Sequence, residues 1–140
     1  LLLQNAAFLT HFREAMRERG DVAELRIDEL TPLESKAGAD ELVGETFAQV
    51  GRDSGAAART ALAFLESGAP AQTLIDAARV TTFLKGNDSH DYKFTSAAFE
   101  DYRNVSPTWR NRFLAASVYK WRGSGETDND LVARTRAALA

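Results

Sequence analysis

The residues best suited to chemistry in this chain lie in the stretch GNDSHDYKF, residues 86–94, which contains one of its two histidines. His90 stands between Asp88 and Asp91, and Lys93 follows it three residues later. Histidine serves as acid, base or metal ligand because its charge changes near physiological pH. The first question is therefore whether His90 belongs to a reactive site or to a helix start that contains a histidine.

The two aspartates have a structural explanation. Asp88 is a preferred N-cap residue, whose side chain accepts from the backbone N–H groups of the first turn. Asp91 then occupies the N3 position of a capping box, and both acids lie at the positive end of the helix dipole. Capping alone accounts for both carboxylates, so neither needs a catalytic role.

Capping does not account for His90. In a helix, positions 90, 94, 97 and 101 share one face, which places His90 in line with Phe94 and Ala97. We therefore expect the ring to point toward neighbouring side chains, as a hydrogen-bonded core residue or as a site residue facing a cavity.

A metal centre made by this chain is not predicted. Asp101 shares the face of His90 but lies about 16 Å further along the helix axis, too far to share an ion. His11 is the only other histidine, no cysteine occurs, and neither His-x-x-x-His nor Glu-x-x-His occurs in the chain. A heme needs one axial histidine, so the cofactor question stays open.

The elements that would position these residues are helices. Apolar residues recur at helical spacing between turn signals, and we expect an all-α fold of about six to seven helices. Short loops predict stacked antiparallel helix hairpins, as a bundle or as an arc of a larger α/α assembly. The expected helices are 2–19, Asp40 to Val50, Ser54 to Gly68, Pro70 to Gly86, the NDSH stretch to Tyr102, Ser106 to Gly123 and Leu131 to Leu139.

Length and composition indicate a single helical domain, residues 1–140, with 44% hydrophobic residues. The chain opens LLLQNAAFLTHF without methionine, which looks like a helix already under way. We expect the C-terminal part of a longer chain or a processed subunit. The missing cysteines fit a reducing compartment such as the cytoplasm, and no apolar run approaches the roughly 18 residues of a membrane span.

The charge pattern argues against nucleic-acid binding. The net charge is −3, although residues 103–122 hold five basic side chains and no acid. Acidic residues predominate over 14–53. We expect the basic face to meet that acidic region, in the same chain or in a partner. The small-residue run SGAAARTALAFL, residues 54–65, predicts close helix–helix packing.

The segment GAPAQTLIDAARVTTFLKGNDSHDYKFTSAAFED resembles the C-terminal part of questin oxidase-like proteins, which are large and almost wholly helical. The resemblance covers about residues 66–105 and rests on a D-x-H-x-x-K element formed by Asp88, His90 and Lys93. It implies an oxygen-using, NADPH-linked oxidation of an aromatic polyketide ketone. It further implies that His90 lines an apolar pocket as general base or hydrogen-bond donor, and that Lys93 holds a developing oxyanion.

Two functions from different classes remain. The chain is either the helical part of an oxidoreductase acting on an aromatic or ketone substrate, or a non-catalytic helical packing or oligomerisation module of a larger protein. The expected partners are the remainder of a larger protein, a second subunit or a second copy, with a small-molecule substrate in the first case. The position of His90 discriminates between the two functions, because an enzyme needs it in a cavity.

Overall fold

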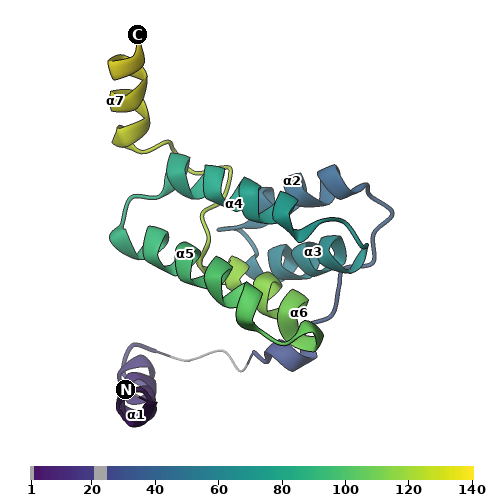
Figure 1. Cartoon of the computed structure of the whole chain (residues 1–140), viewed down its shortest axis with the longest axis vertical. Helices are drawn as coiled ribbons and strands as arrows, with labels where there is room; N and C mark the ends of the chain where they lie inside the picture. The colour runs from purple at the N-terminus through teal and green to yellow at the C-terminus, as the bar shows by residue number, and fades with distance from the viewer. Residues whose placement is uncertain (1, 21–24) are drawn as a thin grey trace.

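The computed structural model describes residues 2–20 and 25–140, which form seven α-helices, two short 3-10 helices and no strand (Figure 1). The all-α prediction, with six to seven helices, is confirmed. The elements are α1 (Leu2–Arg17), η1 (Ile27–Glu29), α2 (Ala39–Gln49), α3 (Ser54–Glu66), α4 (Ala71–Lys85), α5 (Ser89–Asn104), α6 (Pro107–Ser117), η2 (Val118–Lys120) and α7 (Asp130–Leu139).

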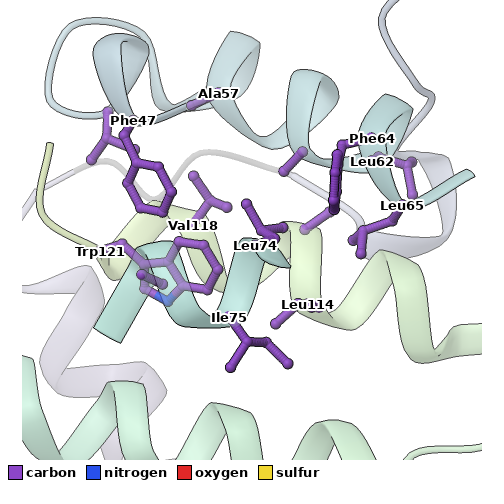
Figure 2. Close-up of a cluster of buried hydrophobic side chains, with 14 of the residues drawn as sticks. Phe47, Ala57, Leu62, Phe64, Leu65, Leu74, Ile75, Leu114, Val118 and Trp121 are labelled. Atoms are coloured by element: carbon purple, nitrogen blue, oxygen red, sulfur yellow. The ribbon is translucent and has the colours of Figure 1, made fainter. Parts of the chain in front are cut away.

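Helix α3 lies at the centre of the body, in contact with α2, α6 and η2. Its small side chains permit this, since Ala57, Ala58 and Ala61 are fully buried and let neighbouring backbones approach closely. Phe64 and Leu62 of the same helix are also fully buried and reach into the main cluster (Figure 2). The predicted packing role of the small-residue run is confirmed.

An aromatic group closes the other side of this core. The rings of Phe47 and Trp121 stack with centroids 5.8 Å apart, and Phe99 meets Trp121 edge-on at the same distance. Figure 2 shows Trp121 beside Phe47 and Val118, on the side of the cluster away from Phe64. The core therefore joins α2 and α5 to the segment that follows α6.

Helix α6 is shorter than predicted. It ends at Ser117 and continues only as the 3-10 turn η2, whereas the sequence pattern predicted a helix up to Gly123. At Gly123 the chain runs so close to the end of α2 that an added Cβ would collide with the Val50 carbonyl oxygen. The next residue, Ser124, donates its backbone N–H to the Phe47 carbonyl at 2.9 Å. A longer helix would prevent this close contact.

Asn129 connects α7 to the end of α4. Its backbone N–H donates to Leu84 at 2.8 Å, and its side-chain amide donates to the carbonyls of Phe83 at 2.8 Å and Gly86 at 2.6 Å. The side-chain oxygen accepts from Val132 and so caps α7. Asn129 holds the start of α7 together with the ion pair between Lys85 and Asp128 at 2.8 Å, while the rest of that helix projects from the body (Figure 1).

Helix α1 differs from the other α-helices because its side chains, where described, are exposed along its whole length. Figure 1 shows it away from the other helices. Gly20, which follows it, has a φ of 130°, as expected of a glycine that stops a helix. Among the described residues, no helix combines the length and apolar character needed to cross a bilayer.

Candidate functional site

The first turn of α5 has the capping box that the sequence predicts. Asp88 is the N-cap and accepts from the His90 backbone N–H at 2.7 Å. Asp91 answers from the N3 position by accepting from the N–H groups of Asn87 at 3.1 Å and Asp88 at 3.2 Å. Both aspartates therefore satisfy backbone donors that the helix cannot pair itself.

The predicted inward orientation of His90 is wrong. Its side chain is 88% exposed, and positions 94, 97 and 101 of the predicted stripe are exposed as well. The buried face of α5 lies one residue further along and contains Thr95, Ala98 and Phe99. Asp91 heads that face, because its carboxylate is drawn toward Arg122 of the body. His90 therefore lies beside the packed face.

His90 is nevertheless held in place by a carboxylate. Its Nδ1 lies 2.7 Å from Asp88 Oδ1, the same oxygen that accepts the backbone N–H. These two hydrogen bonds from His90 lower the pKa of Asp88 below its ordinary value, and the bond from the backbone N–H has the larger effect. The carboxylate therefore stays ionised near neutral pH. With Nδ1 at the carboxylate, the other ring nitrogen is left for a substrate or solvent, which is the arrangement that a general base requires.

Lys93 lies one turn further along α5 and is also exposed. Among the described residues it has no hydrogen-bonding or ion-pair partner, and neither Lys93 nor His90 lines a described cavity. The predicted pair therefore shares the outer surface of one helix. Its catalytic role stays a prediction, because none of the described cavities contains either side chain.

A hydrogen-bond network around Arg122, which was not predicted from the sequence, holds the first turn of α5 against the body. Arg122 donates from Nε at 3.0 Å and from Nη2 at 2.9 Å to Asp91, and from Nη2 to Asn87 Oδ1 at 2.9 Å. Its Nη1 donates to Glu126 at 2.9 Å. Burial alone would raise the pKa of Asp91, but the hydrogen bonds from Arg122 and two backbone N–H groups outweigh it and lower that pKa.

Among the described residues, the basic stretch 103–122 forms no ion pair with the acidic residues of 14–53, and the expected contact with an acidic partner stays a prediction. In the described part of the chain, the ion pairs of Arg122 go to Asp91 and Glu126. Arg112 reaches the acidic region through a hydrogen bond to the Leu30 carbonyl at 3.2 Å. The pKa of Asp28 is lowered chiefly by its hydrogen bond from Arg26, and the charge of Arg112 contributes to the same shift. The ion pairs of Arg122 therefore hold the start of α5 and the loop after η2.

A groove of about 500 Å³ lies between α4 and α5 and was also not predicted. Its floor includes Thr82, Thr95 and Phe99, which are buried, and its rim carries charged side chains. The lining residues are Arg79, Thr82, Phe83, Tyr92, Thr95, Ser96, Phe99, Glu100 and Arg103. They converge only because α4 and α5 pair as a hairpin.

Neither metal ligands nor relatives identify the site further. Within residues 2–20 and 25–140, no three His, Asp or Glu side chains lie close enough to bind one ion together. No family model matches the chain, and no curated protein or solved structure matches it. The resemblance to questin oxidase-like proteins, with its NADPH-linked chemistry, thus stays a prediction carried by the D-x-H-x-x-K element.

Proposed function

We propose that the chain is a non-catalytic helical module that packs through α1 against a second protein surface. The observation that carries this is the exposed apolar face of α1. Phe8, Leu9 and Phe12 are 71%, 65% and 59% exposed, and Met16 continues the same stripe. Contiguous exposed apolar patches of this kind are typical of protein–protein contacts.

Helix energetics supports the same function. A 16-residue helix such as α1 is marginally stable in water when it packs against nothing. Covering each large apolar side chain contributes about 1.5–3 kcal/mol. A partner surface would therefore stabilise α1 and would cover its apolar face, which the described residues of the body leave exposed.

The partner is a second copy of the chain or the remainder of a longer protein. The second copy is tested first because every solution of the chain contains it. Light scattering over a range of concentrations should give a mass above the 15.3 kDa of one chain. The double substitution Phe8→Gln with Phe12→Gln should return the mass to that of the monomer.

Leu3 offers a matched control on the same helix. It is 87% exposed but lies on the opposite side of α1 from Phe12, nine residues away at about 100° per residue. Leu3→Gln should leave the mass unchanged. A chain that is monomeric at every concentration, with unprotected α1 amides in hydrogen exchange, would exclude the second copy and leave a longer protein as the partner to test.

A second candidate function is the helical part of a cytoplasmic oxidoreductase acting on an aromatic or ketone substrate. The contact between His90 Nδ1 and Asp88 Oδ1 favours it, because that contact presents the other ring nitrogen as a base. In this proposal the partner surface encloses His90 and Lys93, and Lys93 stabilises the developing oxyanion. The missing cysteines fit the compartment.

The test is turnover of an aromatic ketone, followed by NADPH consumption and oxygen uptake, in the associated chain or in a longer chain that contains it. His90→Gln should reduce the rate about 100-fold or more, as loss of a general base does. His11→Gln removes the other histidine, which is exposed on α1, and should have no effect. Unchanged turnover in His90→Gln would remove the enzyme proposal and leave the packing module.

A further inference from the structure

We propose that the groove between α4 and α5 binds a planar aromatic carboxylate. Its volume of about 500 Å³ lies within the usual range of small-molecule sites. The groove belongs to one chain and contains neither α1 nor His90. The proposal is therefore independent of the association through α1 and of the chemistry at His90.

The two helices run antiparallel, which gives the groove an aromatic end and a charged end. Thr82 meets Thr95, and Arg79 meets Phe99, so residues later in α4 face residues earlier in α5. Phe83 and Tyr92 consequently share one end, and Arg103 lies at the other. A ligand along the groove would place its ring and its polar group at different ends.

The aromatic end is already ordered. Tyr92 donates its hydroxyl to the Gly86 carbonyl at 2.7 Å, which fixes the ring. Phe83 is 44% exposed although it is a large apolar residue next to the core, so one face of it is uncovered. Phe99 is buried in the floor beneath Arg79, so the ring contacts at this end come from Phe83 and Tyr92. Stacked or edge-to-face contacts with such rings favour an aromatic ligand over an aliphatic one.

The charged end favours a carboxylate. Arg79 lies over the Phe99 ring at 5.6 Å and pairs with Asp76 at 2.8 Å, so its charge is partly compensated. Arg103 has no hydrogen-bonding partner for its guanidinium among the described residues. Glu100 is the one acid in the lining, against two arginines. A guanidinium binds a carboxylate through two parallel hydrogen bonds, which suits Arg103 to this role.

The floor is preformed. Thr95 donates its hydroxyl to the Asp91 carbonyl at 2.7 Å, and Thr82 lies 3.4 Å from Thr95 through its own hydroxyl. These buried polar groups are satisfied within the protein, so the groove need not rearrange to receive a ligand. Binding then loses little free energy to ordering.

The test uses naphthalene-2-carboxylate as the probe and its neutral amide, 2-naphthamide, as the comparison. Titration into isotope-labelled chain should shift amide signals within residues 79–83 and 95–103. Arg103→Gln should weaken the carboxylate about 10-fold, the loss expected for hydrogen bonds to a charged group. Glu100→Gln should tighten it about 2-fold by removing a like charge.

Arg134→Gln, an exposed arginine on α7, is the matched control and should not change the affinity. Three results would overturn the proposal. These are no shift at millimolar probe, shifts confined to α1, or an amide that binds as tightly as the carboxylate. Equal affinities of Arg103→Gln and Arg134→Gln would overturn the assignment of the carboxylate to Arg103.

Discussion

Helices α1 and α3 carry comparable apolar patterns and have opposite surroundings. The 13 residues of α3 include seven that are buried, while the 16-residue α1 has none among its described side chains. Both patterns predict an amphipathic helix. The difference teaches that apolar spacing identifies a face to be buried, whereas the neighbours decide whether the chain itself can bury it.

Chain connectivity and side-chain size explain the difference. Only residues 50–53 separate α2 from α3, so the two helices must pack side by side. The alanines of α3 then allow close contact from several directions. Among the described residues between α1 and α2, η1 is the longest element. The face of α1 carries bulky side chains such as Phe8 and Phe12.

The largest expected effect comes from Phe64 of α3, which is fully buried. Phe64→Ala should lower the free energy of unfolding by about 3–5 kcal/mol, because both the transferred surface and the resulting cavity contribute. Urea denaturation followed by circular dichroism measures it. Phe94→Ala, at an exposed position of α5, is the matched control and should cost far less. Comparable losses for the two variants would contradict the central position of α3.

The second largest change in the free energy of unfolding is expected from the hydrogen-bond network of Arg122. Arg122→Met should lower the free energy of unfolding by about 1–2 kcal/mol at neutral pH, since it removes hydrogen bonds to a charged, partly solvated partner. Urea midpoints of the two proteins measure the loss. Lys120→Met, a neighbouring exposed cation, serves as the control.

The pH dependence of the same network has a defined sign. The pKa of Asp91 is lower in the folded chain than in the unfolded chain, where it is about 3.9. Its stabilising contribution is complete above that value and is lost as the pH falls through the folded pKa. Asp91→Asn should therefore lose stability at pH 7 and approach the parent protein below pH 4. A difference that grows on acidification would contradict this sign.

The N-cap of α3 provides a smaller effect. The Asp53 side chain accepts from the Ala56 backbone N–H at 2.9 Å, so the cap lies one residue before Ser54, where the expected helix begins. Asp53→Ala should cost about 1 kcal/mol, because a backbone donor loses its partner. Asp53→Asn retains an acceptor and should restore most of the stability. Equal losses in Ala and Asn variants would show that capping is not the cause.

Local features were predictable from the sequence because they depend on neighbouring residues. The capping box of Asp88 and Asp91 follows from residue types and spacing alone, and so does the start of α6 next to Ser106. The face of α5 did not follow, because Phe94 suggested a stripe that included His90. Thr95 is buried instead, at no polar cost, since its hydroxyl donates to the Asp91 carbonyl.

Long-range features were not predictable. Arg122 and Asp91 are 31 residues apart, and no local pattern indicates that they meet. The groove between α4 and α5 likewise depends on the register of the hairpin, which sets Arg79 against Phe99. The exposure of α1 could not be predicted from its own sequence, because it depends on where all the other elements lie. Sequence patterns show that a helix has an apolar face, and the tertiary contacts determine what covers that face.

The smallest expected effect on folding is also the most direct test of the comparison between α1 and α3. Phe12 is a phenylalanine like Phe64, but it is 59% exposed. Phe12→Ala should change the free energy of unfolding of the body by less than about 0.5 kcal/mol under dilute conditions. It should nevertheless weaken any concentration-dependent association, whereas Leu3→Ala should not. Sedimentation at two concentrations, beside unfolding curves at the lower one, separates these effects. If Phe12→Ala destabilised the dilute monomer as strongly as Phe64→Ala, α1 would pack on its own chain in solution, and the two helices would differ only in position.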